Sequence, residues 1–171
     1  MPTRPLPGTR LLVKRARPVY AEAIAKLVAE ATGGRIRPTE DDVIDRMGLR
    51  GFFIATAEGN PVGIVGWTAE NLVARVEDYI VHPTSMRPVA GRELLVEVED
   101  AARELECEAA LLLVARGASI DAVTFYESCG YSFRPLAEMP EAWRESAEEV
   151  VSDDRFVMVK QLRAELVRQP I

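Results

Sequence analysis

The most informative part of the chain begins with Y-I-V-H-P at residues 79–83 and ends with S-I-D-A-V-T-F-Y-E-S-C-G-Y at residues 119–131. Between them lie R-P-V-A-G-R at residues 87–92 and the apolar run L-L-L-V at residues 111–114. This order predicts a strand that leads into a helix, then a buried strand and a second helix that carries Tyr126. The free N–H groups at a helix N-terminus favour a phosphate-bearing ligand.

Composition narrows the class of protein. The 171 residues are 48% hydrophobic and 28% charged, which is typical of one soluble globular domain. The net charge of −6 argues against a nucleic-acid-binding surface. The sequence has no apolar run long enough for a membrane span, and its first residues lack the apolar core of a signal peptide. We therefore expect a cytoplasmic protein with neither nucleic acid nor membrane as a partner.

Few residues in the sequence are suited to binding a metal ion. Cys107 and Cys129 lack the paired spacing of a zinc site, and His82 is the single histidine of the chain. We expect two free thiols in a reducing compartment and no metal centre.

Periodicity predicts one α/β domain over residues 10–162, with a disordered lead-in at residues 1–9 and a C-terminal tail at residues 163–171. Residues 138–154 are polar and acidic, and we expect them to form a loop or lid. The other predicted elements are strands at 10–17, 51–56, 62–68, 72–81, 109–115, 131–133 and 155–161, and helices that begin at Pro18, Thr39, Pro88 and either Ser119 or Asp121. Asp42 completes a capping box with Thr39.

Several of these motifs resemble the GNAT superfamily of acyl-CoA-dependent N-acyltransferases. They are V-H-P at residues 81–83, a glycine where the next helix opens (Gly91), and F-Y-E-S-C-G-Y-S-F at residues 125–133. The hairpin sequence E-G-N-P-V-G-I-V-G at residues 58–66 and F-V-M-V-K-Q-L at residues 156–162 extend the resemblance. It implies a GNAT fold, in which about four helices flank a mixed, mostly antiparallel sheet of six to seven strands.

The resemblance also implies a reaction. Acetyl-CoA would be the co-substrate, and the acceptor would be a primary amine of a small molecule or peptide that attacks directly in a ternary complex. The segments that select the acceptor would be residues 35–49 and 138–154. The oligomeric state stays open between monomer and homodimer.

The resemblance assigns a set of cofactor-binding residues. The backbone of residues 79–82 would pair with the pantetheine arm, and the amides of residues 89–92 would hold the pyrophosphate together with the Arg87 side chain. Ser119 stands where the family often has an asparagine that contacts the cofactor, although a plain N-cap explains it equally well. The assigned residues are Ile80, Val81, His82, Arg87, Val89, Ala90, Gly91, Arg92, Ser119 and Phe125.

The predicted pyrophosphate loop departs from the family pattern Q/R-x-x-G-x-G/A. Only Gly91 is retained, and Pro88 removes one potential donor from the loop. The Val89 side chain can obstruct the close backbone approach that glycine permits. A catalytically inactive GNAT-fold binding or regulatory module is therefore the alternative to an enzyme.

Two residues are the candidates for catalysis. Tyr126 occupies the position of the family's usual general acid, where a phenol would stabilise the leaving thiolate. The alternative is an aromatic pair, Phe125 and Tyr126, packed in the core. The family's strand glutamate falls on Arg75, which cannot act as a base. Glu77 lies on the same face by strand alternation, unless a bulge changes the parity, and a solvated edge carboxylate is its alternative interpretation.

Overall fold

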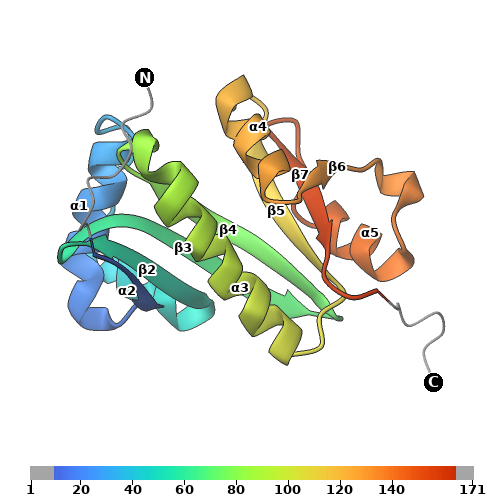
Figure 1. Ribbon diagram of the computed structural model, residues 1–171, viewed down its shortest axis with the longest axis horizontal. Coiled ribbons are helices and arrows are strands. Elements are labelled where there is room, and N and C mark those ends of the chain that lie inside the picture. The colour runs from blue at the N-terminus through green and yellow to red at the C-terminus, as the bar shows by residue number, and fades with distance from the viewer. Residues whose placement is uncertain (1–9, 165–171) are drawn as a thin grey trace. The chain divides into compact units, whose positions relative to one another are not determined.

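The structure is a computed structural model that describes residues 10–164 (Figure 1). The predicted lead-in at residues 1–9 and residues 165–171 of the predicted tail lie outside the described residues. The described chain forms two compact units. The first unit holds residues 10–67 and 78–98, and the second holds residues 68–77 and 99–164. A single domain over residues 10–162 stays a prediction.

Seven strands in the described part of the chain form one sheet, in the order β1-β2-β3-β4-β5-β7-β6. β4 and β5 are parallel, whereas the pairs β1–β2, β2–β3, β5–β7 and β6–β7 are antiparallel. The predicted mixed, mostly antiparallel sheet is thereby confirmed. The strands are β1 (Leu11–Arg15), β2 (Gly51–Ala57), β3 (Asn60–Glu70), β4 (Val73–Val81), β5 (Ala109–Ala115), β6 (Ser132–Phe133) and β7 (Arg155–Gln161).

The β2–β3 connection confirms the hairpin that E-G-N-P predicted. Glu58 and Gly59 form the two-residue turn, and both have a positive φ, of 51° and 80°. Two positive φ values are the geometry of a type I′ turn, which matches the twist of an antiparallel pair.

The described residues contain five α-helices, and one of them corrects the sequence prediction. The predicted loop or lid at residues 138–154 contains α5 (Glu141–Glu148). Trp143, Ser146 and Ala147 recur at helical spacing and are buried, and this narrow stripe is hidden among acidic residues in the sequence. The other helices are α1 (Ala21–Ala31), α2 (Glu40–Leu49), α3 (Arg92–Glu104) and α4 (Ile120–Ser128).

Each unit has its own apolar core. In the first unit, α1 and α2 pack against β2 and β3 (Figure 1), through a cluster that includes Ile24, Val43 and Ile64. In the second unit, α5 packs beside β5 and β7, and Trp143 is fully buried among Leu111 and other strand residues. The indole N–H of Trp143 donates to a carboxylate oxygen of Glu108 at 3.2 Å, so its polar atom is satisfied within the core.

The start of α2 confirms the predicted capping box. The Thr39 N–H donates to Asp42 Oδ2 at 2.9 Å, and the Asp42 N–H donates to Thr39 Oγ1 at 3.1 Å. The hydrogen bond from the Thr39 backbone N–H, followed by that from its side chain, holds the pKa of Asp42 below its ordinary value. The ionised carboxylate therefore stabilises this end of the helix.

This pKa shift predicts an acid-dependent stability. Because the pKa of Asp42 is lower in the folded protein, its stabilisation is present above the unfolded value of about 4 and is lost as the pH falls through the folded value. We expect the Tm difference between wild type and Asp42→Ala to shrink below about pH 4. Circular dichroism melts across this range measure it. Asp41→Ala is the control, and an Asp42→Ala difference independent of pH contradicts the prediction.

Candidate active site

The end of β4 has a polar backbone edge that faces away from β3. The His82 N–H donates to the Val62 carbonyl at 2.9 Å, so the amide of His82 is engaged by β3. Successive residues of a strand direct their N–H and C=O groups to opposite edges, so those of Val81 face the other edge. Among the predicted residues Ile80, Val81 and His82, Val81 is therefore the one whose backbone N–H and C=O groups face the edge suited to an extended ligand arm.

Strand alternation is interrupted at Asp78, which has a φ of +50°. Arg46 Nη1 lies 2.6 Å from Asp78 Oδ1, and Arg50 Nη1 lies 3.0 Å from Asp78 Oδ2. These two ion pairs tie β4 to α2 and to the residue that follows it, within the first unit. The alternation of side chains between the two faces of the strand, counted back from Val81, therefore does not continue past Asp78. Glu77, half-buried immediately before it, stays a predicted base.

The turn that leads into α3 contains the residues predicted to hold a pyrophosphate. Residues Arg87–Gly91 form a π-helical turn, which the Arg92 N–H closes by donating to the Arg87 carbonyl. The Arg92 amide is therefore engaged, and Pro88 has no N–H to offer. Val89, Ala90 and Gly91 lie in this turn, directly before α3, and Ala90 and Gly91 are buried. The assignment of a pyrophosphate to residues 89–92 stays a prediction, to which the half-buried Arg87 adds a positive charge suited to an anion.

The helix α4 carries the remaining predicted residues. Ser119 is its N-cap, because the Ser119 hydroxyl accepts a hydrogen bond from the Ala122 N–H at 3.1 Å. Phe125 and Tyr126 are both half-buried, and their rings meet edge to face with centroids 5.9 Å apart. The predicted aromatic pair of Phe125 and Tyr126 is therefore present, but Tyr126 stays partly exposed and is not enclosed in the core.

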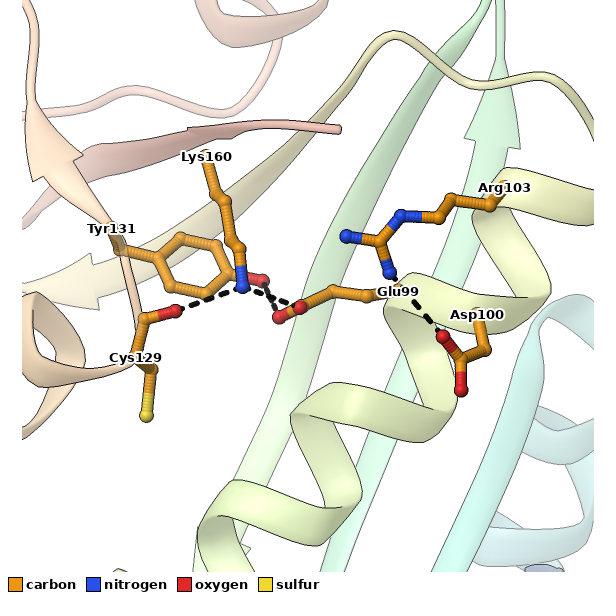
Figure 2. Close-up of polar contacts among 6 residues, drawn as sticks. All are labelled: Glu99, Asp100, Arg103, Cys129, Tyr131 and Lys160. Carbon is orange, nitrogen blue, oxygen red and sulfur yellow. Dashed lines mark hydrogen bonds and ion pairs between the residues drawn. The ribbon is translucent and has the colours of Figure 1, made fainter. Parts of the chain in front are cut away.

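A buried polar cluster anchors the C-terminal end of α4 (Figure 2). We call it the Glu99 cluster. Lys160 Nζ lies 2.6 Å from Glu99 Oε1 and donates to the Cys129 carbonyl at 2.9 Å. The Tyr131 hydroxyl donates to the other Glu99 oxygen at 3.0 Å. Glu99 is only 3% exposed, so the ammonium and the phenol satisfy a carboxylate removed from water. Through Cys129, this cluster holds the helix that carries Tyr126.

The sequence reading overlooked this cluster, although a signal for it was present. Glu99 follows Leu95 by four residues and precedes Ala102 by three, and all three residues are buried. A carboxylate on the apolar face of a helix indicates a buried partner. The partners themselves could not be predicted from the sequence, because Lys160 and Tyr131 are 61 and 32 residues away from Glu99 in the chain.

The first unit also contains a cavity of about 510 Å³. Its walls come from α1, α2, β2, β3 and β4, and residues 36–38 between the two helices complete its lining. This volume lies in the range of small-molecule sites. The segment 35–49, predicted to select the acceptor, contributes part of the wall.

The cysteines and the helices bear on two other sequence predictions. Cys107 and Cys129 are free, as predicted, and both are buried, which raises the pKa of the Cys107 thiol. None of the helices in residues 10–164 is both long and apolar enough to cross a bilayer.

Comparison with known proteins gives one family match and many structural matches. A model of the acetyltransferase (GNAT) family matches residues 21–131. An acetyltransferase of the GNAT family from Staphylococcus aureus Mu50 is 16% identical, with a TM-score of 0.69, over 90% of this chain and 100% of that chain. No curated protein matches the sequence.

Two further solved structures illustrate the range of the fold. The ribosomal-protein-S18-alanine N-acetyltransferase from Escherichia coli is 16% identical, with a TM-score of 0.68, over 95% of this chain and 100% of that chain. A putative acetyltransferase from Salmonella typhimurium, with its cofactor acetyl-CoA, is 15% identical, with a TM-score of 0.67, over 94% of this chain and 99% of that chain. At these identities, the matches establish the fold.

Proposed function

The chain belongs to the acetyltransferase (GNAT) family, as its motifs predicted, and from this premise we propose that it transfers an acetyl group from acetyl-CoA to a primary amine of a small molecule or peptide. The family uses acetyl-CoA as its acetyl donor. The observation that carries the proposal is the match to the family model over residues 21–131, and the polar edge at Val81, followed a few residues later by the turn Arg87–Gly91, supports it.

Each part of the proposed cofactor site has a distinct physical role. The N–H and C=O of Val81 would pair with the amides of the pantetheine arm, in the manner of an added strand. The amides of Val89, Ala90 and Gly91 would hold the pyrophosphate, and the Arg87 guanidinium would neutralise it.

When bound, acetyl-CoA supplies a thioester whose C–S bond breaks as the N–C bond of the product amide forms. The phenol of Tyr126 is the group we assign to donate its hydrogen bond, and then its proton, to the departing thiolate. A phenol of pKa about 10 is matched closely enough to a thiol of pKa about 8.5 for this interaction to strengthen as charge develops.

The acceptor must lose a proton to attack as a neutral amine. The family's strand glutamate falls on Arg75, and Glu77 is the carboxylate two residues further along β4. We assign Glu77 to receive the amine proton, directly or through a water molecule.

Val89 is the loop residue whose side chain can obstruct the pyrophosphate, and its removal is expected to increase the affinity for acetyl-CoA. We expect Val89→Gly to lower the Kd for acetyl-CoA about threefold to tenfold, because removal of the side chain opens the backbone to the pyrophosphate. Isothermal titration calorimetry on both proteins measures the change. Val96→Gly, at an exposed position of α3, is the control for glycine within a helix.

The titration also tests the proposed function itself. Saturable binding of acetyl-CoA by the wild-type protein supports the proposal, and no heat of binding at millimolar ligand would overturn it. If Val89→Gly binds acetyl-CoA with the same affinity as the wild type and Val96→Gly, the assignment of the pyrophosphate to this turn is wrong.

A further inference from the structure

The buried side chains that line the cavity of the first unit are all apolar. Ile24, Val28, Val43, Phe52 and Ile64 line it and are buried, and the half-buried Ile80 of β4 adds a further aliphatic wall. These side chains come from α1, α2 and three adjacent strands, so the enclosure is built by the tertiary structure rather than by one loop. A surface of this kind favours hydrocarbon.

The charged residues that line the cavity are either exposed or held by polar contacts. Arg46 is paired with Asp78, and Asp42 is committed to the capping box with Thr39. Arg37 and Asp45 are exposed. The charged lining residues other than Asp78 are therefore exposed, and the half-buried Asp78 carboxylate is neutralised by Arg46 and Arg50.

This distribution discriminates among primary amines. A polyamine or an amino sugar in the cavity would place ammonium or hydroxyl groups against Ile24, Phe52 and Ile64, where they would lose water without gaining a partner. A hydrocarbon skeleton loses nothing there and gains by burial. The single amino group of such a ligand would stay at the polar opening.

We infer that the acceptor is a primary amine on an apolar skeleton, aliphatic or aromatic, whose hydrocarbon lies in this cavity. The inference rests on the proposed acetyl transfer and names its substrate class. It excludes spermidine, amino sugars and exposed lysine side chains as the preferred acceptors.

A homologous series of amines provides a quantitative test. Each methylene buried from water improves affinity about fourfold. We expect kcat/KM to rise about fourfold per carbon from propylamine to hexylamine, with phenethylamine among the best acceptors. Spermidine and glucosamine should be at least about tenfold poorer than hexylamine. A flat series, or a preference for spermidine or glucosamine, overturns the inference.

Two variants locate the effect in the cavity. Val28→Phe fills it from α1 and should raise KM for hexylamine about tenfold while leaving KM for acetyl-CoA unchanged. Ile36→Ser makes an exposed part of the lining polar without disturbing the core, and should flatten the series. Leu105→Ser is its matched control, because Leu105 is 58% exposed and Ile36 is 56% exposed. If Ile36→Ser behaves like Leu105→Ser, the cavity is not the site.

Direct binding separates this inference from the proposed function. Saturation-transfer NMR of hexylamine with the wild-type protein and CoA reports occupancy without turnover. Binding that is lost in Val28→Phe, with no acetylated product when acetyl-CoA replaces CoA, supports the ligand class and contradicts the enzyme. Acetylation of spermidine without hexylamine binding supports the enzyme and contradicts the ligand class.

Discussion

Replacement of Tyr126 by phenylalanine is expected to lower kcat about a hundredfold, with KM for acetyl-CoA within about twofold of the wild-type value. Phenylalanine preserves the ring and therefore the edge-to-face contact with Phe125. It removes only the hydroxyl, which we propose donates a hydrogen bond to the thiolate that strengthens as the bond to carbon breaks. A loss confined to kcat is the signature of an interaction made in the transition state.

Steady-state kinetics with saturating hexylamine measure this change. Tyr20→Phe, at the half-buried Tyr20 of the first unit, is the control for loss of a phenolic hydroxyl outside the proposed site. Equal kcat in wild type and Tyr126→Phe would remove Tyr126 from the mechanism. A rise in KM at constant kcat would assign it to binding instead.

Replacement of Lys160 by methionine is expected to destabilise the protein by about 3 kcal/mol. The methionine keeps the length of the side chain but leaves the Glu99 carboxylate buried without its cation, and the Cys129 carbonyl without its donor. Chemical denaturation gives the difference in the free energy of unfolding. The double variant Glu99→Met with Lys160→Met should recover most of the loss, because it removes both charges.

The adjacent pair in Figure 2 is the matched control for this prediction. Arg103 Nη1 lies 3.3 Å from Asp100 Oδ1, on side chains that are 43% and 64% exposed. Arg103→Met should cost less than about 0.5 kcal/mol, since water screens the pair. A Lys160→Met loss no larger than the Arg103→Met loss would show that the Glu99 cluster contributes no more than a surface ion pair.

Most of the sheet was predictable because its signals are local. The Glu58-Gly59 turn and the apolar run of β5 carry strand information within a few residues. The helix α5 was not predicted, because its stability comes from packing of Trp143 and Ala147 against β5 and β7 rather than from its acidic sequence. Tertiary packing of this kind leaves only a weak periodic signal.

The sequence predicted which residues form the candidate site, but it predicted only part of their arrangement in space. The turn before α3 and the N-cap Ser119 followed from their positions in the motifs. The positive φ of Asp78 and its two arginine partners did not, because a break in a strand and contacts 28 and 32 residues apart have no local signature. The cavity is equally nonlocal, since its walls come from five separate elements.

The most direct test of acetyl transfer follows both products of one reaction. Purified protein is incubated with acetyl-CoA and hexylamine, free CoA is quantified by thiol release, and the amine is analysed by mass spectrometry. The account predicts N-acetylhexylamine and CoA in equal amounts, at rates reduced about a hundredfold in Tyr126→Phe. CoA release without any acetylated amine across the series, polyamines and peptides included, would contradict it.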